Sequence, residues 1–294
     1  MVLKSYAKLN LYLSIRQKRK DNYHNLDTLF ERIDLCDIIT LGNRQDSLIR
    51  ITCENRDVPT DASNLCYQAA RLIQKQCTIK RGVDIRIDKN IPVGSGLGGG
   101  SSNAATVLMG LNQLWKLGLP RRTLCNFAKE IGSDVSFFIH NIPFARGRGR
   151  GEKIEPLQQL SRLRLWHVLI VPKLHLRTPF IYRKWDEFTK KNKKARLTRQ
   201  TLNVRILISL LKKEKLRDLT GLLFNELEQV VFLNYPQLRG IKELLIHSGL
   251  DVALMSGSGG TIFGITSSKK EAIAAIKSLN VKGRPWQIFL TRTI

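Results

Sequence analysis

The chain has 294 residues, long enough to bury the core of one large domain or of two ordinary ones. Hydrophobic residues make up 43% of it, and no segment approaches the roughly 20 apolar residues of a membrane-spanning helix, which excludes a disordered chain and a helical membrane protein. The net charge of +25 favours an anionic partner: a nucleic acid, a membrane surface or a phosphorylated small molecule.

The first predicted element is a strand near the N-terminus. Leucines occupy alternate positions from 9 to 13 and Ile15 continues the series, which is the period of a strand. Asn10 and Ser14 interrupt the apolar run, and no small-residue cleavage site follows, so the segment is not typical of a signal peptide. We therefore expect a cytoplasmic chain.

The following segments indicate strands and then helices. Apolar residues alternate from 83 to 87 and recur at helical spacing from 104 to 114, where Ser101 or Ser102 is the expected N-cap. We predict a polar turn at 18–25, strands at 33–41 and 83–87, and helices at 104–114 and 122–131.

The segment "PVGSGLGGGSSNAA" at 92–105 lies between a predicted strand and a predicted helix. It lacks the lysine of a Walker A loop, and its match to a dinucleotide fingerprint has neither a strand running directly into the loop nor an acid about 20 residues later. Glycine lets the backbone approach a phosphate, and a helix N-terminus directs amides at an anion. We therefore predict a loop that wraps a triphosphate; the alternative is a flexible turn.

The composition shifts near residue 155, after "ARGRGRGE" at 145–152 and at Pro156. We place a boundary there, with domains at 1–155 and 156–294. The second half is predicted to contain strands at 165–172, 252–256, 261–266 and 286–292, helices from about 178 and at 199–212, 217–231, 237–249 and 269–279, and a glycine-rich turn at 256–260. Strands and helices mixed in this way indicate an α+β fold in two lobes.

Two other features exclude or weaken particular functions. The five cysteines are scattered and form no C-x-x-C pair, which argues against a disulfide framework and against a zinc site. "ARGRGRGE" resembles an RNA-binding arginine–glycine box, but it is one short copy, and the basic run "KKNKKAR" at 190–196 has no interleaved aromatics. A nucleic-acid partner is therefore not favoured.

The glycine-rich segment resembles the ATP-binding motif of the GHMP kinase superfamily. "AKLNLYLSI" at 7–15, "DNYHNLDTLF" at 21–30 and "MSGSGGTIFGI" at 255–265 extend the resemblance over nearly the whole chain, and narrow it to a member whose small-molecule substrate is cytidine-diphosphate-linked methylerythritol. The resemblance implies a two-lobed GHMP kinase fold, with an N-terminal ribosomal-protein-S5-like lobe and a C-terminal ferredoxin-like lobe. It also implies an ATP- and Mg²⁺-dependent kinase that acts on a hydroxyl in isoprenoid precursor biosynthesis.

The resemblance implies two catalytic residues. Asp134 in "IGSDVSFF" matches the family's catalytic aspartate, although Ser136 replaces the usual proline, and from the sequence alone Asp134 is equally typical of a helix N-cap. Lys8 matches the lysine that pairs with this aspartate and with the reacting hydroxyl, where a cation favours the developing alkoxide. A lysine in a strand otherwise extends to solvent.

The resemblance also implies binding residues. Tyr23 would stack on cytosine, with His24 bonded to the base edge and Tyr182 closing the stack, while Asn10 and Thr178 line the substrate site. The residues implied for ATP are Asn64, Leu65 and Lys89 at adenine, and Pro92, Val93, Gly94, Ser95, Gly96, Leu97, Gly98, Gly99, Gly100, Ser101 and Ser102 at the phosphates. The 256–260 turn would close over the phosphates or the substrate. An extra Arg-Gly unit in 140–152 leaves the register uncertain, so we assign no site residue or metal ligand there.

Two other functions remain open at this point. A related GHMP kinase acting on mevalonate or homoserine would have no need for Tyr23, His24 and Tyr182 to converge. A basic RNA-binding protein that retains the fold would show strongly salt-dependent binding without ATP turnover. The sequence does not choose between a monomer and a homodimer.

Overall fold

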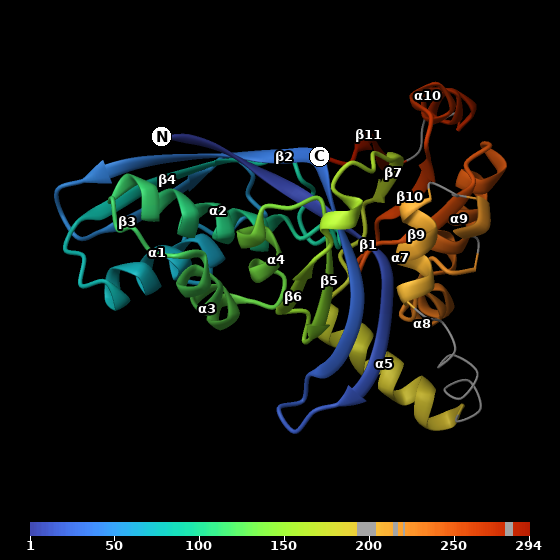
Figure 1. Cartoon of the computed structure of the whole chain (residues 1–294), viewed down its shortest axis with the longest axis horizontal. Helices are drawn as coiled ribbons and strands as arrows, with labels where there is room; N and C mark the ends of the chain where they lie inside the picture. Colours follow the sequence, from blue (N-terminus) through green and yellow to red (C-terminus); the bar gives the residue numbers. More distant parts are fainter. Residues whose placement is uncertain (193–203, 214–216, 220, 280–284) are drawn as a thin grey trace.

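The computed structural model describes residues 1–192, 204–213, 217–219, 221–279 and 285–294 (Figure 1). Its strands form two sheets, one of seven strands and one of four. The seven-stranded sheet contains β1 (Val2–Lys18), β2 (His24–Arg44), β3 (Ile49–Cys53), β4 (Gly82–Asp88), β5 (Phe144–Gly149), β6 (Lys153–Pro156) and β8 (Phe224–Asn225).

The four-stranded sheet is antiparallel, with the order β11-β7-β10-β9. Its strands are β7 (Trp166–Pro172), β9 (Val252–Met255), β10 (Ile262–Thr266) and β11 (Trp286–Arg292). The helices are α1 (Leu65–Gln76), α2 (Gly99–Leu114), α3 (Arg121–Ile131), α4 (Val135–His140), α5 (Thr178–Lys191), α7 (Val204–Lys212), α8 (Glu228–Asn234), α9 (Pro236–His247) and α10 (Lys269–Ser278), with short 3₁₀ turns at Gln158–Leu160 and Arg217–Leu219.

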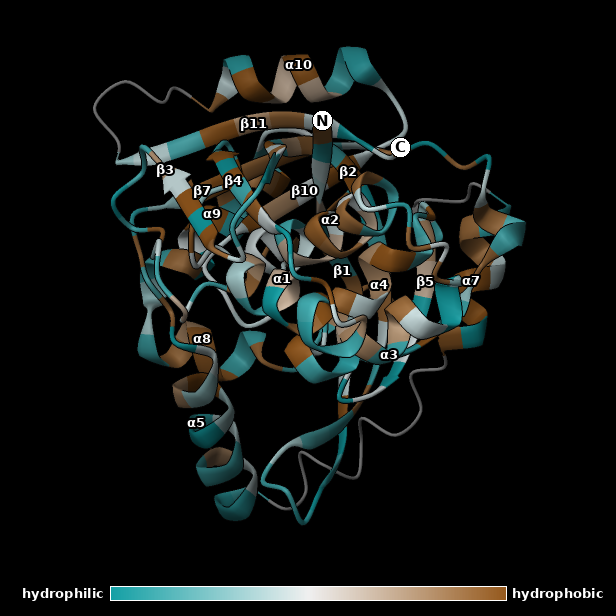
Figure 2. Cartoon of the chain, turned by 90° about the vertical axis from the view of Figure 1, so that its left-hand side faces the viewer, coloured by the Kyte–Doolittle hydropathy of each residue, from teal (hydrophilic) through white to brown (hydrophobic). Residues whose placement is uncertain are grey.

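Helix α2 lies at the centre of the first half and packs on β1 and β2 (Figure 2). Its first half is almost entirely buried, because Ala104, Ala105 and Val107 face the core that the sheet shares with α1, α3 and α4. On the far side of β1, Leu9 and Leu11 pack with apolar residues of the four-stranded sheet. Strand β1 is therefore buried on both faces.

This burial changes the prediction for the first strand. The alternating leucines are buried as expected, but the polar residues on the opposite face of the strand, Lys8, Asn10 and Ser14, are buried as well. Lys8 therefore does not extend to solvent. It lies inside the protein, where a charged group requires polar partners.

Figure 1 shows the long β1–β2 hairpin bending away from the sheet, with its tip near α5. Asp186 of α5 ties the two elements together, because it forms an ion pair with Lys18 of the hairpin and a hydrogen bond with His24. The hairpin and α5 thus form one wall of the pocket described below.

Two predictions are wrong: the N-cap of one helix and the helix at 217–231. Helix α2 begins at Gly99 with Gly98 as its N-cap, so Ser101 and Ser102 lie in its first turn instead of capping it. The segment predicted as a helix at 217–231 contains the short strand β8, which pairs in parallel with β1, and becomes α-helical only at Glu228. The first residues of the helix predicted at 199–212 lie outside the described residues.

Several elements have no clear signal in the sequence: α1, α4, β3, β5 and β6. The strands predicted within β1, β2, β4, β7, β9, β10 and β11 are confirmed, as are the helices corresponding to α2, α3, α5, α9 and α10. Each of the five cysteines is a free thiol. No helix in the described part of the chain combines the length and the apolar character needed to cross a membrane.

Candidate active site

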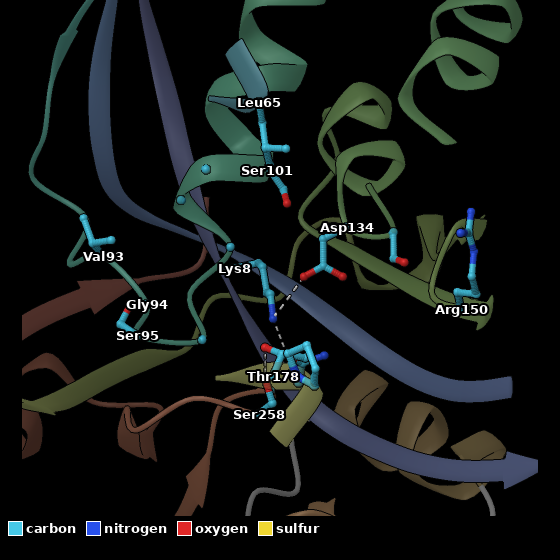
Figure 3. Close-up of a pocket in the computed structure, with 18 of the residues that line it drawn as sticks. Lys8, Leu65, Val93, Gly94, Ser95, Ser101, Asp134, Arg150, Thr178 and Ser258 are labelled. Carbon is cyan, nitrogen blue, oxygen red and sulfur yellow. Dashed lines mark hydrogen bonds and ion pairs between the residues drawn. The ribbon is translucent and has the colours of Figure 1, made fainter. Parts of the chain in front are cut away.

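A cavity of about 910 Å³ opens between the start of α2, the β1–β2 hairpin, the start of α5 and the turn that joins β9 to β10 (Figure 3). Most of the residues that the sequence singles out line it. Those lining the cavity are Lys8, Asn10, Tyr23, His24, Asn64, Leu65, Lys89, Pro92, Val93, Gly94, Ser95, Gly96, Gly98, Gly99, Gly100, Ser101, Asp134, Thr178 and Tyr182. Elements far apart in the chain therefore meet at one site.

Two of the predicted phosphate-binding residues do not line the cavity. Leu97 is fully buried in the core, and its carbonyl accepts the backbone N–H of Lys8 at 3.0 Å. Ser102 is also buried, and its hydroxyl accepts a hydrogen bond from Ser5 at 2.8 Å. Both residues fix the base of the loop, and neither offers its side chain to a ligand.

Glycine is required at three points of the loop that leads into α2. Gly94, Gly96 and Gly98 have φ angles of 66°, 83° and 72°, a region that side chains disfavour. This backbone lets the chain turn so that α2 starts at the cavity. The first-turn amides of α2 have no acceptor within the helix, so together with the helix dipole they form a site for an anion.

A second glycine-rich turn, at 256–260, holds this loop from the other half of the chain. Ser256 donates its hydroxyl to the carbonyl of Gly96 at 3.1 Å, and Thr261 donates its hydroxyl to the carbonyl of Ser95 at 2.7 Å. A Cβ on Gly96 would lie 2.4 Å from the Ser256 carbonyl oxygen. The two turns therefore touch backbone to backbone, and the loop is held in one conformation.

Asn225 holds the second glycine-rich turn in place through hydrogen bonds. Its amide group donates to the carbonyls of Met255 and Gly257, at 2.8 and 2.7 Å, and its side-chain oxygen accepts the N–H of Leu227. The residue stands in β8, within the segment that the sequence analysis interpreted as a helix. Its role depends on the pairing of β8 with β1, which no local pattern indicated.

Lys8 and Asp134 lie side by side in the wall of the cavity, near the N-terminal end of α2. The Lys8 ammonium is 3.5 Å from an Asp134 carboxylate oxygen, with the two side chains 4% and 31% exposed. Lys8 also donates to Asn10, whose amide in turn donates to Thr28 at 2.8 Å. Figure 3 shows the Asp134 carboxylate and the Ser101 hydroxyl facing the same space.

Asp134 occupies the N-cap position of α4 but makes no side-chain capping hydrogen bond. The sequence left Asp134 open as a helix N-cap or a catalytic aspartate. The residue has the position of a cap, but its carboxylate is directed to Lys8 and the cavity. A buried ammonium beside a carboxylate that remains reachable from the cavity can orient a hydroxyl and stabilise the negative charge that develops on it.

The residues implied for adenine lie together at another part of the cavity wall. The side chain of Asn64 caps α1, because its oxygen accepts the N–H of Cys66 at 2.8 Å. Lys89 pairs with Asp37 at 2.7 Å, and burial lowers the pKa of Lys89 even though Asp37 raises it. Leu65 adds an apolar surface. Asn64 and Lys89 are therefore already engaged within the protein.

The end of the cavity at the β1–β2 hairpin carries the aromatic residues. Tyr23 is 52% exposed, and the Arg150 guanidinium lies 5.0 Å from its ring centroid. His24 is buried and stacks on Tyr182 with 5.3 Å between ring centroids. Tyr182 thus supports His24 directly. Thr178 contacts Ser258 of the second glycine-rich turn, with 2.7 Å between the hydroxyl oxygens.

Sequence reasoning missed five charged residues that line this end: Lys18, Asp21, Arg150, Arg183 and Asp186. Lys18 pairs with Asp186, whereas Arg150 and Arg183 have no carboxylate partner among the residues that the structure describes. Arg150 lies at the tip of the β5–β6 hairpin, within the "ARGRGRGE" segment that carries the extra Arg-Gly unit. The unusual spacing of that unit was its one signal in the sequence.

Comparisons with known proteins show which family this chain resembles. The models for the GHMP kinases N terminal domain and for the GHMP kinases C terminal match residues 64–141 and 207–284. A protein named 4-diphosphocytidyl-2-C-methyl-D-erythritol kinase from Alkaliphilus metalliredigens is 39% identical over 95% of this chain and 92% of its own length. One of the same name from a Geobacillus species is 40% identical over 90% of this chain and 88% of its own.

Solved structures show the same likeness. A crystal structure of 4-(cytidine 5'-diphospho)-2C-methyl-D-erythritol kinase matches with a TM-score of 0.78 and 31% identity, covering all of both chains. A homoserine kinase from Cytophaga hutchinsonii matches with a TM-score of 0.70 at 17% identity, over 98% of this chain and 94% of its own, a likeness of fold alone. The predicted two-lobed GHMP fold is confirmed.

Proposed function

The chain belongs to the family of 4-diphosphocytidyl-2-C-methyl-D-erythritol kinases, within the GHMP kinases, and we propose that it transfers the terminal phosphate of ATP to the 2-hydroxyl of 4-diphosphocytidyl-2-C-methyl-D-erythritol. This is a step in non-mevalonate isoprenoid precursor biosynthesis. The observation that carries the proposal is the Lys8–Asp134 pair, 3.5 Å apart, beside the amides at the start of α2.

Asp134 is the general base in this proposal. Its carboxylate orients the attacking hydroxyl and accepts its proton as the oxygen bonds to the terminal phosphorus and the bond to the bridging oxygen of ATP breaks. Lys8 stabilises the negative charge on the attacking oxygen, and Asn10 holds the ammonium in place through its hydrogen bond. Phosphoryl transfer depends mainly on positioning and charge, which these buried groups supply.

The triphosphate of ATP lies against residues 94–101, where glycine leaves the backbone amides accessible. Leu65 provides an apolar contact for the adenine, beside Asn64 and Lys89. Mg²⁺ fits this loop as the companion of the ATP phosphates, with the Ser101 hydroxyl as a protein oxygen at the mouth of α2, and it neutralises phosphate charge when bound. Ser101 lines the cavity with these residues, and its hydroxyl faces the space beside Asp134 (Figure 3).

The substrate lies at the other end, with its cytosine at Tyr23 and His24 and its sugar alcohol near Asn10 and Thr178. Its diphosphate then requires a cation, and Arg150 meets that need because it stands beside Tyr23 with no carboxylate partner in the described part of the chain.

Replacing Arg150 with Ala should raise the KM for the cytidyl substrate about tenfold, corresponding to the loss of one charge-assisted contact of about 1.4 kcal/mol. The KM for ATP should not change, because Arg150 lies away from the glycine loop. Steady-state kinetics with each substrate varied in turn measures both values. Arg148→Ala is the matched control, because Arg148 comes from the same hairpin but pairs with Glu155 outside this cavity. Equal effects of the two substitutions would remove the assigned role.

An ATP-consumption assay with and without the cytidyl substrate tests the function itself. We expect turnover only when the cytidyl compound is present, and none with mevalonate or homoserine. The second alternative, an RNA-binding protein, would give salt-dependent RNA binding and no ATP turnover. Neither alternative explains the aromatic residues at the hairpin end of the same cavity.

Three further points of the proposal concern the chain as a whole. The lobes divide near residue 155, although β8 from the second lobe adds to the sheet of the first. The enzyme works in the cytoplasm, on a small-molecule substrate. It acts as a monomer or a homodimer.

A further inference from the structure

Asp186 joins the substrate end of the cavity from α5, and its carboxylate has two partners. One oxygen lies 2.8 Å from Nε2 of His24, and the other accepts a hydrogen bond from the Lys18 ammonium at 2.5 Å. Burial alone would raise the pKa of Asp186, but the hydrogen bonds from Lys18 and His24 outweigh it and lower that pKa. Asp186 is therefore an ionised acceptor at neutral pH.

The ring of His24 is held on more than one side. It is buried, stacks on Tyr182 with 21° between the ring planes, and meets Trp185 edge-on with 5.4 Å between centroids. Tyr182, Trp185 and Asp186 all belong to α5. Helix α5 therefore sets both the plane of the imidazole and the direction of its Nε2 atom.

An ionised carboxylate can only accept hydrogen bonds, so the hydrogen of a neutral His24 must lie on Nε2. The other ring nitrogen, Nδ1, is then an acceptor. His24 lines the cavity, and Asp186 is its side-chain hydrogen-bond partner within the described residues. A ligand that bonds to Nδ1 must offer a donor.

We propose that Asp186 is a positioning residue for base selection: it fixes His24 as the tautomer with hydrogen on Nε2, so that Nδ1 accepts a hydrogen bond from the exocyclic amine of cytosine. The amine is the one donor on the pairing edge of cytosine. Uracil carries a carbonyl oxygen at that position, which would place two lone pairs against each other. The inference rests on the proposed function, namely that the substrate carries a cytidine diphosphate.

The kinetic test compares the cytidyl substrate with its uridyl analogue. The wild-type enzyme should prefer the cytidyl compound by at least about 100-fold in kcat/KM, since a site built for a donor rejects an acceptor strongly. Asp186→Ala and Asp186→Asn should reduce this preference at least tenfold, because neither keeps the ring in one tautomer. The change should appear in the KM for the cytidyl substrate, with kcat and the KM for ATP retained.

Glu187→Gln is the matched control. Glu187 is the next residue of α5, it pairs with Lys184 at the surface, and it does not line the cavity. It should keep the wild-type preference. A purely structural role of Asp186 would lower activity toward both substrates alike and leave their ratio unchanged, which would overturn the inference.

A second measurement reads the tautomer in the wild-type protein, so it does not depend on the folding of an Asp186 variant. Nitrogen-15 NMR of the wild-type protein with labelled histidine reports which ring nitrogen carries hydrogen, and His24→Gln identifies the signal. In the neutral ring we expect hydrogen on Nε2 alone; a neutral ring with hydrogen on Nδ1 would contradict the assignment. If the wild-type enzyme does not turn over the cytidyl substrate, the proposed function fails. If it does and the base preference survives in the Asp186 variants, only this inference fails.

Discussion

Asp134→Asn should lower kcat by about 10³-fold, because the change removes both the proton acceptor and the negative partner of a buried ammonium. The asparagine keeps the size of the side chain, so the pocket retains its shape. Binding of ATP should stay within about twofold of wild type, since the amides that hold the phosphates belong to the loop before α2 and to its first turn. Single-turnover kinetics and titration calorimetry with a non-hydrolysable ATP analogue measure the two effects.

Glu130→Gln controls for the loss of one negative charge. Glu130 is an exposed residue near the end of α3, a few positions before Asp134, and its substitution should leave kcat unchanged. An Asp134→Asn enzyme that turns over at more than about a tenth of the wild-type rate would show that another group accepts the proton.

Gly96→Ala should lower kcat/KM for ATP about 100-fold and reduce the free energy of unfolding by about 2 kcal/mol. The residue has a φ of 83°, and its new Cβ would lie 2.4 Å from the Ser256 carbonyl oxygen, so the loop must move away from the second turn. Strain of this kind costs about 1–3 kcal/mol, and a shift of about 1 Å in a positioned phosphate can cost 10²-fold in rate. Urea unfolding and steady-state kinetics measure the two effects.

Gly240→Ala is the control for adding a methyl group. Gly240 lies within α9 with open space where its Cβ would point, and its φ is not positive. Alanine there should raise helix stability by about 0.5–1 kcal/mol and leave kinetics unchanged. If Gly96→Ala behaved like Gly240→Ala, the two glycine-rich turns would not hold the phosphate loop.

Local signals in the sequence predicted much of the fold and the glycine-rich loop that leads into α2. Alternation marked the strands within β1 and β4, a continuous apolar run marked β7, and helical spacing marked α2 and α3, because each pattern reflects which sides of one element are buried. The glycines at 94, 96 and 98 were predictive for the same reason: positive φ angles and close backbone approach are demands made by the local chain.

Local signals failed where a residue acts through a distant partner. Residues 217–231 were interpreted as an amphipathic helix, but Phe224 and Asn225 instead pair with β1. The Asn225 amide donates to the carbonyls of Met255, at the end of β9, and Gly257, just after it. The predicted N-caps Ser101 and Ser102 failed because Gly98, in a left-handed conformation, starts the helix earlier.

The sequence by itself determined that this chain forms an α+β fold with a glycine loop before a helix, since glycine conformation and side-chain periodicity are properties of short segments, and its resemblance to the GHMP kinases implied the kinase fold. Only the tertiary structure decided that Lys8 is buried against Asp134, that Ser256 clamps Gly96, and that Asp186 and Arg150 stand beside Tyr23 and His24. Each of these depends on which elements pack together and exclude water. A buried charge or hydrogen-bond donor is stable only with a polar partner. For these residues that partner lies far away in the chain, which no local pattern can indicate.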